Sequence, residues 1–322
     1  MGDIAAILPA CFGLTGIRAT KERGHFICKT GTGLTKIYKT TESHLSIKAR
    51  FMLLEKIEAA GFPYIDKILT STQNMPFVKL GQETFVMCQH VRSQDLDLNC
   101  PDHVKIAVQA IASFHKVAKG LGDTKTPEAP PLTDVFSKNL TSLHKIKRQL
   151  SKNSRYSDFD MMFLKNIGDY QQYAEQSLDI LEATHYLGFY QEAIDQQHIC
   201  HQELEEENLL LNGNICYIKQ FDRAGVGVQI ADFAKFLYRY GRRSNRHIPL
   251  ATLVDWYSSV LPISQEARQI ILAYLTHPWQ FMKVVDQHYS KKRGWTPIAM
   301  TTRMESLLQA QEAYNAFIMA GC

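Results

Sequence analysis

The sequence lacks several features that would assign the chain to a large class of proteins. Its seven cysteines form no CxxC pair, which favours free thiols in a reducing compartment. No apolar run approaches the roughly 18 residues that a membrane span needs. A formal charge of +4 is too small for a dedicated nucleic-acid binder. The first residues have no basic segment typical of a secretory signal. We therefore expect a cytoplasmic protein without a membrane span or a nucleic-acid partner.

The composition favours a folded, enzyme-sized chain. Apolar residues make up 45% of the 322 positions and charged residues 21%, so a large core can be buried and global disorder is excluded. A chain of this length is long for one compact domain. Two lobes are the natural expectation.

The first 90 residues read as a β-rich lobe with one helix. Glycines at 24, 31 and 33 separate β-prone runs between residues 17 and 39, a pattern typical of successive hairpins. Apolar residues at helical spacing predict a helix over 46–60, which Gly61 ends. Two strand-like runs, 64–71 and 83–91, follow.

The remaining chain reads as mainly helical. Residues 136–152 and 158–184 predict long helices, and the chain after Asp232 is helical to the end. The exception is 198–222, where Asn212-Gly213 between apolar runs predicts a hairpin. The fold class is therefore α+β and bilobal, with lobes 1–90 and 91–322 and the hairpin 198–222 in the second lobe.

The hairpin carries a pattern that resembles the catalytic segment of kinase-like phosphotransferases. Those enzymes have His-x-Asp, an Asn five residues later, and a second Asp on the next strand. His201 and Asn208 match in type and spacing. Glu203 and Gln220 stand where the two aspartates are expected, and Asp222 follows two residues on.

Further matches extend the resemblance to the bacterial spore-coat CotS family of kinase-like proteins, which have the aminoglycoside-phosphotransferase type of fold. The matching segments keep the family's order over most of the chain. They are Lys-Ile-Tyr-Lys ending at Lys39, Ile111-Ala-Ser-Phe-His115, Ile230-Ala-Asp-Phe-Ala-Lys-Phe-Leu237 and His277-Pro-Trp-Gln-Phe281.

The resemblance implies roles for individual residues. Lys39 would bind ATP phosphates, with Gln89 and Val91 as further cofactor contacts. Glu203 would take the position of the catalytic base, with His201 bracing its loop and Asp232 a structural partner. The metal positions would be Asn208, Asp222 and Gln220. The helix 46–60 should supply an acidic partner for Lys39; Arg50 falls near that position and Glu55 about a turn later, so the partner stays open.

Two functions remain as hypotheses. The first is a degenerate kinase-fold protein that binds ATP and Mg²⁺ weakly or not at all. It would act as a binding or structural component of the endospore coat, with other coat proteins or a small molecule as partners. The second is an active phosphotransferase on a small hydroxyl-bearing substrate. There Glu203 would be the base, and Asn208 and Asp222 would hold Mg²⁺.

Overall fold

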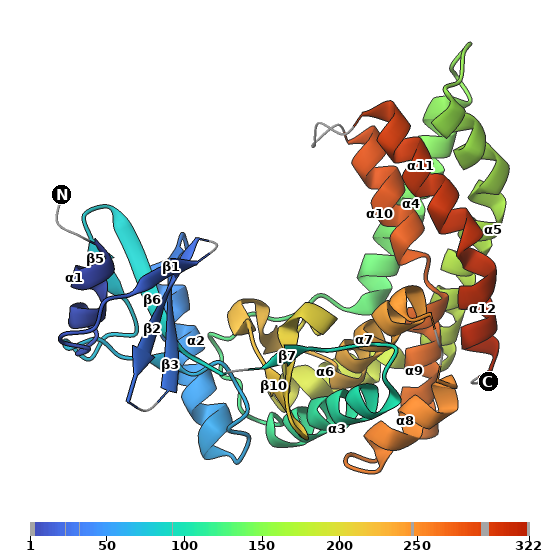
Figure 1. The fold of residues 1–322 in the computed structure, drawn as a ribbon. Coiled ribbons are helices and arrows are strands. Elements are labelled where there is room, and N and C mark those ends of the chain that lie inside the picture. The colour runs from blue at the N-terminus through green and yellow to red at the C-terminus, as the bar shows by residue number, and fades with distance from the viewer. Residues whose placement is uncertain are drawn as a thin grey trace. The chain divides into compact units, whose positions relative to one another are not determined.

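The chain forms two compact units (Figure 1). A computed structural model describes residues 4–22, 24–31, 33–91, 93–245, 248–290 and 296–320. The first unit comprises Met1–Pro127 with Gln197–Val226, and the second Glu128–Gln196 with Gly227–Cys322. The described strands all lie in the first unit, and the second is built of helices. The predicted α+β class is confirmed.

The main sheet of the first unit is antiparallel and follows the predicted hairpins. Its strand order is β1-β2-β3-β6-β4, with β5 also paired to β6. The register sets Ile37 opposite Met87 and Tyr38 opposite Val86. The strands are β1 (Thr20–Glu22), β2 (His25–Thr30), β3 (Gly33–Thr40), β4 (Ile68–Leu69), β5 (Val78–Leu80) and β6 (Glu83–His90).

Two helices accompany this sheet. Helix α1 (Ile4–Cys11) buries Leu8 in a cluster with Ile37 and Met87. The sequence did not predict α1, because Pro9 interrupts a short apolar run. Helix α2 (His44–Ala59) matches the predicted helix and begins at Ser43, whose side chain accepts the Ser46 N–H. Strand side chains alternate, so Tyr38 points away from the α1 cluster.

The predicted hairpin of the later chain is confirmed as β9 (Leu209–Asn212) and β10 (Ile215–Ile218). Gly213 in its turn has φ +58°, a left-handed conformation that glycine adopts without strain. Strand β7 (Gln94–Asp95) extends the hairpin by pairing with β9, while β8 (Ile199–Cys200) and β11 (Gly225–Val226) form a separate two-stranded sheet. Helix α3 (Pro101–Val117) belongs to the same unit.

The two compact units do not divide at residue 90, where the sequence placed the boundary between the lobes. Backbone hydrogen bonds tie the hairpin to the first unit. Ile218 N–H donates to Tyr64 C=O, and Ile199 N–H donates to Ala118 C=O. Residues 91–127 and the hairpin therefore pack with the N-terminal sheet.

The second unit is a helical assembly with an aromatic core. Tyr170 stacks on Phe281 at 3.8 Å between ring centroids, within a cluster contributed by α4, α5, α10 and α11. The predicted helices 136–152 and 158–184 correspond to α4 and α5. The helices are α4 (Leu132–Leu150), α5 (Asp158–Ala183), α6 (Tyr186–Asp195), α7 (Gln229–Arg243), α8 (Leu250–Ser258), α9 (Gln265–Thr276), α10 (Trp279–Tyr289), α11 (Pro297–Gln309) and α12 (Gln311–Met319).

Candidate functional site

His201 begins the loop that precedes the hairpin. Its side chain is fully buried, and Nε2 donates to the Lys219 carbonyl at 2.9 Å. Nδ1 accepts the Glu203 N–H at 3.2 Å. Because a carbonyl can only accept, the proton is assigned to Nε2. The ring thus joins the loop to the end of β10.

Asn208 holds the same loop from its other end. Its Nδ2 donates to the Glu203 carbonyl at 2.8 Å, while Lys219 N–H donates to the Asn208 carbonyl. The Asn208 side chain is buried, and its Oδ1 has no hydrogen-bond partner within the described part of the chain. The Asn208 side chain thus keeps one buried acceptor that no described residue occupies.

Glu203 presents its carboxylate to solvent. The side chain is 41% exposed, and Oε1 lies 3.7 Å from Nε of Arg223. A loose, exposed ion pair of this kind contributes little to stability. The carboxylate is therefore accessible and is not held by a strong ion pair.

Gln220 has a left-handed backbone with φ +66°, uncommon for a residue other than glycine. Its N–H donates to Asp66 Oδ2 at 3.1 Å. Burial raises the pKa of Asp66 to about 6, against the lowering effect of this hydrogen bond. Asp66 Oδ1 is buried and finds no partner in the described residues. The sequence had not singled out Asp66.

Arg50 of α2 is the cation at the centre of the site, and its side chain is only 9% exposed. The guanidinium lies 3.1 Å from Glu42 Oε1 and 3.9 Å from Asp222 Oδ1. It also donates to Tyr38 Oη at 3.1 Å. Arg50 therefore takes the place that the sequence reserved for an acidic helix residue.

Lys39, the predicted ATP-binding lysine, lies on the other face of β3 from Tyr38. Its ammonium pairs with Glu83, and the side chain is 53% exposed. The face that meets Arg50 carries Tyr38 and Lys36, whose Nζ is 6.0 Å from the Tyr38 ring centroid. The structure thus brings Tyr38, rather than Lys39, to the helix residue.

A second lysine adds positive charge near Lys36. Burial, and then the charge of Lys36, lower the pKa of Lys219. The same two causes lower the pKa of His90, which lies at the end of β6. The side chains of the site are thus cationic on this side and acidic around Arg50.

Gln89 and Val91, the other predicted cofactor contacts, line a cavity of about 600 Å³. Lys67 and Tyr217 line it as well. Asp232 is buried in the first turn of α7, in the second unit. These residues do not belong to the Arg50 cluster.

The donors do not fit an ordinary magnesium site. Mg²⁺ is held by carboxylates and water in near-octahedral geometry. Gln220 and Asn208 offer neutral amides, and Asp222 already faces Arg50. In the described ranges no group of three or more His, Cys, Asp or Glu side chains could hold a metal ion.

Comparison with known proteins identifies the family and the fold. A family model described as "Spore coat putative kinase YutH" matches residues 7–320. The chain belongs to this family. The assignment confirms the resemblance to kinase-like spore-coat proteins. Among the residues that the structure describes, no helix of this family member has the length and apolar character to cross a membrane.

Solved structures similar to this YutH family member share its fold. An aminoglycoside phosphotransferase from Alicyclobacillus acidocaldarius is 17% identical, with a TM-score of 0.82 over 94% of this chain and 90% of that one. A spectinomycin phosphotransferase bound to AMP is 11% identical, with a TM-score of 0.68 over 97% of both chains. A choline kinase from Cryptosporidium parvum is 13% identical, with a TM-score of 0.54 over 96% of both. The fold is kinase-like, of the aminoglycoside-phosphotransferase type.

Proposed function

We propose that this protein is a degenerate kinase that serves the spore coat as a binding or structural component. The observation that carries the proposal is the buried guanidinium of Arg50 among Tyr38, Glu42 and Asp222. The family assignment supports the coat as the setting. The protein would be made in the cytoplasm of the sporulating cell and deposited in the coat, with other coat proteins or a small molecule as partners.

The residues around Arg50 differ from the arrangement that active kinases need. In those enzymes a strand lysine pairs with a helix glutamate, and a carboxylate on the later hairpin holds Mg²⁺. Here the strand supplies a phenol and the helix supplies the cation. Asp222 faces that cation at 3.9 Å, so Mg²⁺ would have to compete with a fixed guanidinium for it. Strong Mg²⁺-dependent ATP binding is therefore not expected.

The charges of Lys36 and Lys219 are compatible with weak nucleotide binding. Their positive charges would attract phosphates without a metal. Structural neighbours include proteins solved with AMP or with AMP-PNP and Ca²⁺. We propose that any nucleotide bound here is held weakly and is not turned over.

Active phosphoryl transfer is the second candidate. The exposed carboxylate of Glu203 and the unpartnered Oδ1 of Asn208 favour it. Glu203 would accept the proton of a substrate hydroxyl, but its carboxylate is one methylene longer than that of Asp. A misplacement of about 1 Å can lower a rate about 100-fold.

Thermal unfolding with ATP, with and without Mg²⁺, separates the two candidates when combined with phosphate release. The degenerate kinase should show no Mg²⁺-dependent shift, and release should stay at background in Glu203→Gln and Gln220→Asp. An active enzyme should lose turnover in Glu203→Gln and gain it in Gln220→Asp. Glu305→Gln, which removes an exposed carboxylate of α11, is the matched control. Turnover that follows the active pattern would refute the degenerate kinase.

A further inference from the structure

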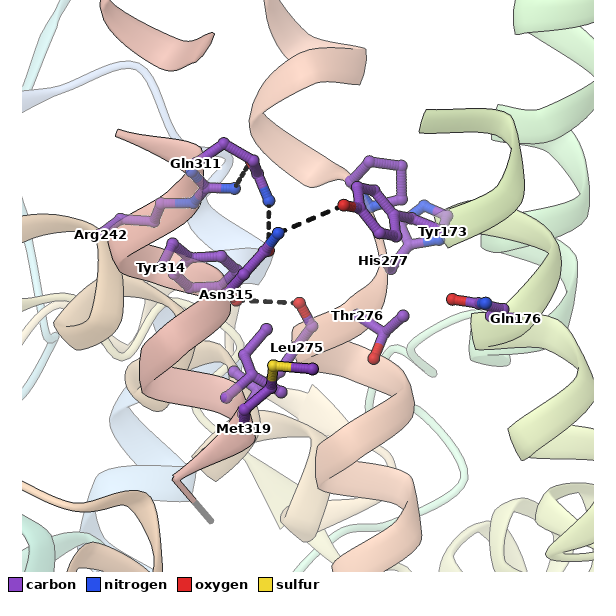
Figure 2. A pocket seen from close by; sticks show the side chains of 12 residues that line it. Tyr173, Gln176, Arg242, Leu275, Thr276, His277, Gln311, Tyr314, Asn315 and Met319 are labelled. Carbon is purple, nitrogen blue, oxygen red and sulfur yellow. Dashed lines mark hydrogen bonds between the residues drawn. The ribbon is translucent and has the colours of Figure 1, made fainter. Parts of the chain in front are cut away.

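A second cavity, of about 240 Å³, lies wholly within the helical unit (Figure 2). Helices α5, α7 and α12, the end of α9 and the segment between α9 and α10 form its walls. It is smaller than the about 300–1,000 Å³ typical of sites for drug-sized ligands. Arg242 on its wall is ten residues beyond Asp232 on α7, or about 15 Å along the helix axis. The cavity is thus separate from Asp232, the predicted site residue that lies in the same unit.

Arg242 supplies the only charged side chain that lines this cavity in the described part of the chain. Its Nη2 donates to Gln311 Oε1 at 2.8 Å, and its Cζ lies 3.8 Å from the Tyr314 ring centroid. No lining residue is Asp or Glu, and no ion pair of Arg242 occurs among the described residues. Nε is buried without a hydrogen-bond partner there. The cation is therefore held in place but not neutralised.

The remaining polar groups of the wall are neutral and partly prearranged. Gln311 Nε2 donates to Asn315 Oδ1 at 2.7 Å, and Asn315 Nδ2 donates to Tyr173 Oη at 3.2 Å (Figure 2). His277 adds no charge, because burial lowers its pKa to about 3. Gln176 and Thr276 also line the space. Such a wall can hydrogen-bond a ligand once Arg242 has oriented it.

We propose that this cavity binds a small organic monocarboxylate, with its carboxylate on Arg242. A guanidinium matches the planar geometry of a carboxylate. One cation balances one negative charge, whereas a phosphate monoester carries about −1.5 to −2 at neutral pH. Leu275, Ile318 and Met319 give the apolar part of such a ligand a surface to contact. The site does not depend on whether the first unit transfers phosphate.

Calorimetric titration of the full chain tests the site with matched probes. Acetate, lactate and benzoate are compared with acetamide, lactamide and benzamide, and with inorganic phosphate. At least one carboxylate should bind at one site per chain, about tenfold or more tightly than its amide, because a hydrogen bond to a charged group is worth about 1.5–3 kcal/mol. The proposal is overturned if no carboxylate binds, if each amide binds equally well, or if phosphate binds more tightly than every carboxylate.

Two variants connect binding to Arg242. Arg242→Gln should weaken the best carboxylate about 10- to 100-fold. Asn315→Asp keeps the acceptor for Gln311 but places a negative charge in the cavity, so it should weaken binding even if Arg242→Gln fails to fold. Arg243→Gln, on the exposed side of the same helix, is the matched control and should leave affinity unchanged. Binding that persists in Asn315→Asp would overturn the proposal.

Discussion

The two units each hold one arginine in a polar site, and the two arginines differ in what surrounds them. Arg50 in the first unit has Glu42 at 3.1 Å and Asp222 at 3.9 Å. Arg242 in the second unit has an aromatic ring at 3.8 Å and the amide of Gln311. One cation is balanced by the protein's own carboxylates, while the described lining of the other includes no carboxylate.

The two arginines show two ways in which a partly buried charge can be balanced. A charge taken out of water must be paired, or its burial is costly. At Arg50 the chain supplies the counter-charge through Glu42 and Asp222, so the guanidinium needs no ligand to balance it. At Arg242 the counter-charge is left to a ligand. In the unit with the kinase-like hairpin, the Arg50 guanidinium is balanced by carboxylates of the protein, whereas the described lining of the helical cavity leaves the position opposite Arg242 open.

Removing each arginine charge should give the largest contrast. Arg50→Met leaves Glu42 and Asp222 without their cation, so we expect a loss of about 3 kcal/mol in the free energy of unfolding. Arg242→Met loses an amide hydrogen bond and a ring contact but strands no carboxylate, so the expected loss is about 1 kcal/mol. Urea unfolding followed by far-UV circular dichroism measures both.

Arg50→Lys is the control for the larger effect, because it keeps the charge and should recover part of the loss. The tryptophans that the structure describes, Trp256 and Trp279, both lie in the second unit, so their fluorescence reports that unit. Equal losses for the two methionine variants would contradict the comparison.

Most helices and strands could be predicted because their own stretches of sequence carry strong local patterns. The Asn-Gly turn specified the hairpin β9–β10, and apolar spacing specified α2, α4 and α5. The compact units were not predictable, because backbone bonds such as Ile218 to Tyr64 join segments that are distant in sequence. No pattern within a short stretch of sequence predicts such a bond.

The site was predictable only along the hairpin. His201 and Asn208 were found from their spacing, and both contact the loop backbone. The structure places Tyr38, one residue before the predicted Lys39, on the face of β3 that meets Arg50, and a shift of one residue reverses the face of a strand. Burial of Ile37 in the α1 cluster identifies the face, and that burial depends on a helix that the sequence did not predict. Asp66 carries no motif at all.

The two units should also respond to pH in opposite directions. Burial lowers the pKa of His277 to about 3, below its ordinary 6.5, so its contribution is complete above pH 6.5 and lost as the pH falls toward 3. Burial raises the pKa of Asp66 to about 6, above its ordinary 3.8, so its contribution is complete below pH 3.8 and lost as the pH rises through 6.

Difference measurements isolate each group. Between pH 4.5 and 7.5, the stability of the wild type relative to His277→Gln should rise by about 3 kcal/mol, and relative to Asp66→Asn it should fall by about 2 kcal/mol. Tryptophan fluorescence follows the first pair and circular dichroism the second. Two slopes of the same sign would disprove the assignment of these charges.

The smallest expected effect concerns the wall of the carboxylate cavity, where α12 contacts α7. A Cβ on Gly241 would lie 2.5 Å from Cδ1 of Phe317 and 3.0 Å from Cε2 of Tyr314, so Gly241→Ala should push α12 outward and cost about 1 to 2 kcal/mol. Gly168→Ala is the matched control: a Cβ there meets nothing within 4 Å on α5, so it should stabilise that helix by about 0.5–1 kcal/mol. Carboxylate affinity should fall in Gly241→Ala and stay constant in Gly168→Ala.

Because Arg50 and its carboxylates lie in the other unit, the change in unfolding free energy caused by Arg50→Met should be the same in the Gly241→Ala and Gly168→Ala backgrounds. A changed response would show that the two sites are coupled.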